Sequence, residues 1–206
     1  MAKQYDAAYY EYWSRSPRTR VVSDATLARE VALVLGVAEM VLERPVVSVL
    51  DVGCGEARWM PVLARARPGI RYQGLDSSRW AVTTWGEQRN IRYGRFGKLG
   101  KAGVQGLFDI VLCAGILPYL TDQTLAEGLK ELEALCGGVA FLELYVKADS
   151  RQARFGGDFA GLKWRSAAKY QRICKAAGWE FLGMQCWAPR RVASTLWTFQ
   201  YCPHGA

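Results

Sequence analysis

Hydrophobic and polar positions alternate along the chain in blocks that predict helices and strands in turn. Apolar residues recur at helical spacing after the N-cap pair Ser23-Asp24, and Pro45 ends this helix. The continuous apolar run Val46–Val52 suits a strand buried on both faces. Further strands are expected at Ile70–Leu75, Ile91–Tyr93, Leu107–Cys113 and Val139–Val146. Further helices are expected at Tyr5–Trp13, Ala57–Arg67, Ser77–Gln88, Thr121–Leu135 and Trp164–Ala177.

The end of the chain departs from this alternation. Two strand-like runs, Trp179–Trp187 and Val192–Tyr201, are joined by the short segment Ala188–Arg191, which predicts an antiparallel hairpin. Strands that alternate with helices form a mostly parallel sheet with helices on both faces. We therefore expect an α/β fold: one domain over residues 1–206, with a doubly wound, mostly parallel, seven-stranded sheet and a reversed C-terminal strand.

Composition agrees with one globular domain, because half of the 206 residues are hydrophobic. No apolar stretch has transmembrane length, and the start of the chain shows no export signal, so a cytoplasmic location is expected. The six cysteines form no CxxC pair, and His204 is the single histidine. This predicts reduced thiols and no metal site.

The net charge of +8 leaves the partner open. A basic excess favours an anionic partner, such as nucleic acid or a substrate with a carboxylate or phosphate. The arginines are spread along the chain rather than gathered in one run, which favours solvated surface charge as their explanation.

The stretch VLDVGCGEAR, residues 49–58, carries the most chemical information. It follows a predicted strand and opens a helix, which is where ligands bind in open α/β sheets. Asp76 ends the next strand and is placed to accept hydrogen bonds from ribose hydroxyls. The dinucleotide fingerprint needs a third glycine where this chain has Arg58. The carboxylates of Asp51 and Glu56 disfavour a pyrophosphate and suit a cofactor with an ammonium and a sulfonium.

Four motifs in order, VLDVGCGEAR, YQGLDSS, FDIVLCAGILPYL and GGVAFLELY, resemble those of class I S-adenosylmethionine-dependent methyltransferases. The resemblance runs from Val46 to the terminal hairpin. It implies S-adenosylmethionine as the cofactor and S-adenosylhomocysteine as the product. The cofactor-binding residues that it implies are Asp51, Gly53, Cys54, Gly55, Asp76, Ser77, Ser78, Cys113, Ala114 and Gly115. The loop after the third strand lacks the family's usual acid, so Phe96 and Gly97 are expected beside the adenine.

The methyl acceptor is expected to be a small molecule methylated on nitrogen or oxygen. The loop GILPY lacks the [DN]PP[YF] motif of DNA and protein amino-methylases, and in this it resembles the small-molecule branch of the family. In-line transfer of the methyl group depends mainly on the alignment of the acceptor atom with the methyl carbon. The candidates for orienting or deprotonating the acceptor are Glu143, Tyr145 and Tyr119.

Two segments are candidates for covering the substrate: residues 1–22, termed the N-terminal lid segment, and the loop 147–163. The candidate substrate-binding residues are Tyr9, Trp13, Arg18 and Arg165, with the arginines facing an anionic group. Alternatively, the lid segment is a helix packed on the sheet and Arg165 forms a surface ion pair. A tRNA or rRNA methyltransferase is the rival function, and a non-catalytic cofactor-binding domain is a third.

Overall fold

The computed structural model describes residues 3–151 and 158–196, and seven strands within these ranges form one sheet. The strands are β1 Ser48–Val52, β2 Arg71–Asp76, β3 Ile91–Tyr93, β4 Phe108–Cys113, β5 Cys136–Leu142, β6 Trp179–Gly183 and β7 Cys186–Pro189. Their order is β3-β2-β1-β4-β5-β7-β6. The first five are parallel, and β7 runs antiparallel to both β5 and β6. The predicted seven-stranded α/β fold is confirmed.

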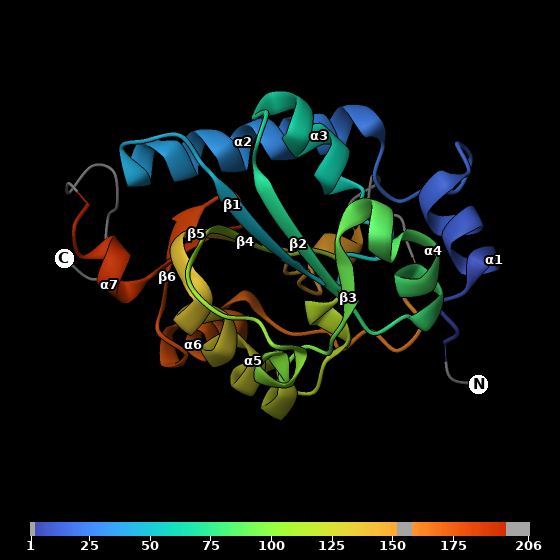
Figure 1. The fold of residues 1–206 in the computed structure, drawn as a ribbon. Helices are drawn as coiled ribbons and strands as arrows, with labels where there is room; N and C mark the ends of the chain where they lie inside the picture. Colours follow the sequence, from blue (N-terminus) through green and yellow to red (C-terminus); the bar gives the residue numbers. More distant parts are fainter. Residues whose placement is uncertain (1–2, 152–157, 197–206) are drawn as a thin grey trace.

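Helices cover both faces of the sheet (Figure 1). Helices α2 Asp24–Leu42 and α3 Trp59–Ala66 lie on one face, and α5 Asp122–Leu135 and α6 Ala167–Ala176 lie on the other. Helix α4 Arg79–Arg89 packs beside β2 and β3. The remaining helical elements are short: α1 Ala7–Tyr10, the π-helix η1 Glu11–Arg15, the 3-10 helices η2 Leu99–Ala102, η3 Leu117–Tyr119 and η4 Asp149–Arg151, and α7 Arg190–Ala193.

The strands divide the core into two layers because successive side chains point to opposite faces. Val49 and Ile110 belong to the cluster under α2 and α3. Leu50 and Val111, their neighbours in sequence, belong to the cluster under α5 and α6. All four side chains are fully buried. This explains why the strand sequences are continuously apolar rather than alternating.

The terminal hairpin exists, but its predicted position is wrong. Both strands lie within Trp179–Pro189, and the two-residue turn between them is Met184-Gln185. Both turn residues have positive φ, 49° and 64°, a conformation that hairpin turns usually give to Asn or Gly. The segment expected as the last strand begins instead with α7, and its residues beyond 196 lie outside the described residues.

Other boundaries also differ from expectation, and β5 ends at Leu142 rather than at Val146. Strand β5 begins at Cys136, so the glycines expected to separate helix from strand lie inside it. A Cβ at Gly138 would lie 2.5 Å from the carbonyl oxygen of Asp109, so glycine allows this close strand contact. Helix α6 begins after Ser166, whose side chain caps it, rather than at Trp164. The first helix is α-helical only over Ala7–Tyr10.

Among the described residues, the structure contains no helix that is long and apolar enough to cross a membrane.

Candidate active site

A cavity of about 510 Å³ opens beyond the carboxyl ends of the parallel strands. The loops after β1, β2, β3, β4 and β5 contribute to its wall, together with α2 and the lid segment. Of the predicted cofactor residues, those that line it are Asp51, Gly53, Cys54, Gly55, Asp76, Ser77, Phe96, Ala114 and Gly115. These residues come from three of the four motifs and from the loop after β3.

The loop after β1 takes a backbone path that its glycines permit. Gly53 and Gly55 have φ values of 78° and 54°, in the left-handed region. The amide of Gly53 donates to the carbonyl of Leu75 over 2.7 Å, and the amide of Gly55 donates to the Asp76 carboxylate over 2.7 Å. A Cβ at Gly55 would lie 2.9 Å from the ring of Tyr10. The loop is therefore tied to the end of β2 and leaves room only for glycine.

Asp76 is held at the end of β2 by main-chain amides. Its carboxylate accepts hydrogen bonds of 2.7 Å from Ser78 and from Gly55. Burial raises the pKa of Asp76, while these amides and that of Ser77 act in the opposite direction. A carboxylate has about four acceptor sites, so lone pairs remain for ligand hydroxyls in the cavity.

Asp51 lies on the floor of the cavity as a fully buried acid. The hydroxyl of Tyr72 donates a hydrogen bond of 2.7 Å to its carboxylate. Burial raises the pKa of Asp51 to about 7, partly offset by this hydrogen bond. A cation in the cavity would stabilise the ionised form, so the site fits the ammonium or sulfonium of the expected cofactor.

Glu143 follows β5 and also lines the cavity. Its carboxylate accepts hydrogen bonds from the amide of Gly115 and the hydroxyl of Tyr145, while burial raises its pKa. Tyr145 is not among the lining residues; it lies behind Glu143 and fixes its orientation.

Tyr119 lines the cavity, but its hydroxyl is engaged by the protein. It donates to the carbonyl oxygen of Asp158. The ammonium of Lys3 lies 4.1 Å from the centre of its ring and 2.7 Å from the Asp158 carboxylate. Burial is the main cause that raises the pKa of Tyr119 to about 12. These contacts link the lid segment to the described part of the loop 147–163; residues 152–157 of that loop lie outside the described residues.

The lid segment lies across the cofactor end of the cavity. Tyr9 and Tyr10 line the cavity, and the Tyr10 ring stacks on Trp80 with centroids 5.1 Å apart. Arg15 forms an ion pair of 2.6 Å with Glu56 in the loop after β1. The segment is therefore joined both to α4 and to the loop after β1.

Several predicted site residues do not line the cavity. Cys113 is buried in the core, and Ser78 caps α4 by accepting a hydrogen bond from Ala81. Gly97 packs towards α5, near Thr124. The remaining two are Trp13, which is partly buried, and Arg18, which is exposed.

Arg165 is expected to bind a substrate anion, but it makes its contacts within the protein and does not line the cavity. Its side chain is buried, forms an ion pair of 2.8 Å with Asp122 and donates to the carbonyl of Leu120. It also lies 3.4 Å from the hydroxyl of Tyr170. The guanidinium joins α5 to the segment before α6. Arg165 does not line the cavity, and the alternative of an ion pair agrees with the contact to Asp122, although the Arg165 side chain is buried.

Glu30 is the cavity residue that the sequence pattern missed. It lies on α2, three residues after the buried Leu27 and directly before the buried Val31. Burial raises the pKa of Glu30 to about 7, with Glu143 adding to the rise and Arg58 opposing it. An acid beside the apolar face of a helix was the available signal.

The described residues contain no group of three or more His, Cys, Asp or Glu that could hold a metal ion.

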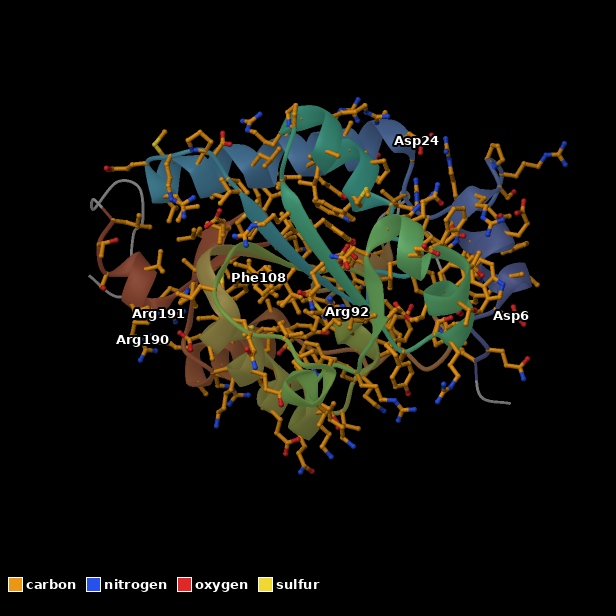
Figure 2. All side chains as sticks on the ribbon, viewed as in Figure 1. Asp6, Asp24, Arg92, Phe108, Arg190 and Arg191 are labelled. Carbon is orange, nitrogen blue, oxygen red and sulfur yellow. The ribbon has the colours of Figure 1, made fainter. Side chains whose placement is uncertain are left out.

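Arg190 and Arg191 lie far from the lid segment. Figure 2 shows these two arginines at one end of the molecule and Asp6 of the lid segment at the other. The two arginines pair with Glu180 and Glu133, so their charge lies away from the cavity.

No protein-family model matches the chain, and no curated protein matches it in sequence. Solved structures do match. CalS10, an amino pentose methyltransferase from Micromonospora echinaspora solved with bound SAM, is 19% identical with a TM-score of 0.61, over 87% of this chain and 90% of that one. DesVI from Streptomyces venezuelae is 16% identical with a TM-score of 0.60, over 79% of this chain and 92% of that one.

The magnesium protoporphyrin IX methyltransferase ChlM from Synechocystis, solved with bound SAH, is 16% identical with a TM-score of 0.59, over 85% of this chain and 86% of that one. At these identities the likeness shows the fold alone. The chain therefore has the Rossmann-like fold of S-adenosylmethionine-dependent methyltransferases, as the sequence motifs predict.

Proposed function

We propose that the chain is an S-adenosylmethionine-dependent methyltransferase that acts on a small molecule. The observation that carries the proposal is the arrangement of Asp51, Gly55 and Asp76 around one cavity at the switch between β1 and β4. Asp76 is available to ribose hydroxyls, and Asp51 is an acid that a cationic ligand would stabilise. The negative charge of a pyrophosphate would be repelled by the carboxylates of Asp51 and Asp76.

Each element of the chain has a distinct role in this proposal. Asp76 binds the ribose, and Asp51 with the glycine loop holds the methionine end. Phe96 and the lid residue Tyr10 exclude water from the cofactor. When bound, S-adenosylmethionine supplies a methyl group on a positively charged sulfur. The apolar part of the cavity aligns the acceptor with that group, which is the principal requirement of the transfer.

The small-molecule acceptor is supported by the neighbouring structures. CalS10 is named for an amino pentose and ChlM for magnesium protoporphyrin IX, and both share most of their length with this chain. The lid segment also supports it, because Tyr9 and Tyr10 contribute aromatic side chains to the cavity wall. These observations favour a small acceptor over tRNA or rRNA.

Calorimetric titration with S-adenosylhomocysteine tests the cofactor part of the proposal. The wild-type chain is expected to bind one equivalent, and Asp76→Ala should weaken binding by at least about tenfold, or about 1.4 kcal/mol. Glu87→Ala is the control, because Glu87 is exposed on α4 and does not line the cavity. Equal affinity in wild type and Asp76→Ala, or no binding by the wild type, would contradict the proposal.

A further inference from the structure

Two carboxylates from different elements face the same part of the cavity. Glu30 comes from α2, and Glu143 comes from the end of β5. Glu143 lies beside Gly115, since a Cβ built there would be 3.9 Å from its Oε2 atom. The apolar side chains of Leu27 and Ile116 also line the cavity. This end of the cavity, which we term the acceptor end, is apolar with two acids.

The positive charges of the cavity wall offset the acids of the acceptor end only in part. Two arginines belong to the described wall, Arg58 and Arg95. Arg58 donates hydrogen bonds of 3.0 Å to the carbonyl of Val22 and to Asp24. Arg95 donates to the hydroxyl of Tyr93, at the end of β3. Both guanidinium groups therefore donate their hydrogen bonds to groups other than Glu30 and Glu143, although the charge of Arg58 still lowers the pKa of Glu30.

Acids outnumber these cations. The acidic residues of the described wall are Glu30, Asp51, Glu56, Asp76 and Glu143. Glu56 has Arg15 as its partner, whereas Glu30 receives no hydrogen bond or ion pair within 4.0 Å from the described residues. An anionic acceptor would meet repulsion here, and a cationic one would supply the charge that the wall lacks.

We propose that the acceptor carries a basic amine, that Glu143 holds its ammonium form and that Glu30 accepts its proton. This inference rests on the proposed methyltransferase function and replaces the expectation of an anionic substrate. The ammonium gives one proton to the Glu30 carboxylate and becomes a neutral amine. The nitrogen lone pair then forms the bond to the methyl carbon while the carbon–sulfur bond breaks, and its electron pair stays on sulfur. The methylated nitrogen carries the positive charge.

The surroundings of Glu30 suit a group that gains and loses a proton near neutrality. The charged groups that face it are Glu143 across the cavity and Arg58 before α3. Burial raises the pKa of Glu30 to about 7, with Glu143 adding to the rise and Arg58 limiting it. Tyr145 fixes Glu143 from behind, which leaves Glu30 as the acid with an unengaged carboxylate.

The test compares three probes of equal size: benzylamine, benzyl alcohol and benzoate. Each is titrated calorimetrically into the chain saturated with S-adenosylhomocysteine. Benzylamine is expected to bind at least about tenfold more tightly than benzoate. Glu143→Gln and Glu30→Gln should each weaken benzylamine binding about tenfold, and Glu87→Gln should not change it. The pH dependence of benzylamine binding near pH 7 should disappear in Glu30→Gln.

Two controls keep the outcome interpretable. Glu30→Asp retains the charge and should keep more affinity than Glu30→Gln, and thermal unfolding shows that each variant is folded. Tighter binding of benzoate, unchanged benzylamine affinity in the Gln variants, or no binding by any probe would overturn the inference. Titration of S-adenosylhomocysteine into the same samples separates the two proposals: its failure to bind removes the proposed function, whereas its binding without amine binding removes only the acceptor class.

Discussion

The hydroxyl of Ser78 donates a hydrogen bond of 2.6 Å to the main-chain carbonyl of Tyr5, which joins the start of α4 to the lid segment. The same oxygen accepts a hydrogen bond of 3.1 Å from the amide of Ala81 and so caps α4. One side chain therefore fixes a helix terminus and holds the lid segment beside Asp76. Because Asp76 accepts a hydrogen bond from the amide of Ser78, the lid segment and the acid that we propose to bind the ribose are held by one turn of backbone.

Ser78→Ala should release the lid segment as well as the helix cap. Loss of the cap costs about 1 kcal/mol of the free energy of unfolding. Loss of the hydrogen bond between Ser78 and Tyr5 should make S-adenosylhomocysteine dissociate faster, which stopped-flow displacement measures. Ser166→Ala is a matched control, because Ser166 caps α6 through the amide of Lys169. It should lower stability by a similar amount and leave dissociation unchanged. Equal dissociation rates in both variants would contradict a role for Ser78 in lid closure.

Two glycines in helices should respond to alanine in opposite directions. A Cβ at Gly128 of α5 would lie 2.0 Å from the ring of Phe96, so Gly128→Ala must displace a cavity-lining side chain. We expect a loss of about 1–3 kcal/mol in the free energy of unfolding. Gly36 of α2 is exposed with no atom within 4 Å of an added Cβ, so Gly36→Ala should raise stability by up to about 1 kcal/mol. Urea denaturation measures both values, and a stabilising Gly128→Ala would show that the Phe96 contact is misplaced.

Asp51→Asn should increase stability at alkaline pH while it weakens cofactor binding. In the native state burial raises the pKa of Asp51 to about 7, against 3.8 for an aspartate in water. The native chain thus holds this proton longer than the unfolded chain, and stability falls as pH rises from 3.8 to about 7. Asp51→Asn has no carboxyl group to titrate at this position, so its stability should not fall with pH for this reason.

Thermal unfolding of wild type and Asp51→Asn between pH 5 and pH 8 measures the effect. The variant should gain on the wild type as pH rises, by more than about 1 kcal/mol at pH 8. Its affinity for S-adenosylhomocysteine should fall, because the ammonium loses a charged partner. A stability difference that does not depend on pH would mean that the Asp51 carboxylate is not desolvated in the native chain.

The sequence predicts most of the fold because buried strands and capped helices leave local patterns. Ser23 and Thr121 lie at the predicted N-caps, and β3 has its predicted bounds. The hairpin turn was missed because Met184 and Gln185 adopt positive φ without the usual Asn or Gly. That conformation is imposed by the pairing of β6 with β7 rather than by local preference.

The candidate site also contains residues that the sequence predicts and residues that it does not. Glycines and acids at strand ends are predictable because the topology brings those ends together, as it does for Gly53 and Asp76. Arg165 could not be assigned, since its partner Asp122 lies on another element. Glu30 reaches the cavity only through the packing of α2 on the sheet, and sequence spacing alone does not show that packing.

A crystal structure of the chain with S-adenosylhomocysteine tests the central claim most directly. We expect both ribose hydroxyls to lie within hydrogen-bond distance of the Asp76 carboxylate, and the sulfur to lie at the acceptor end, towards Glu30 and Glu143. A ligand bound outside the cavity, or a ribose that makes no contact with Asp76, would contradict it.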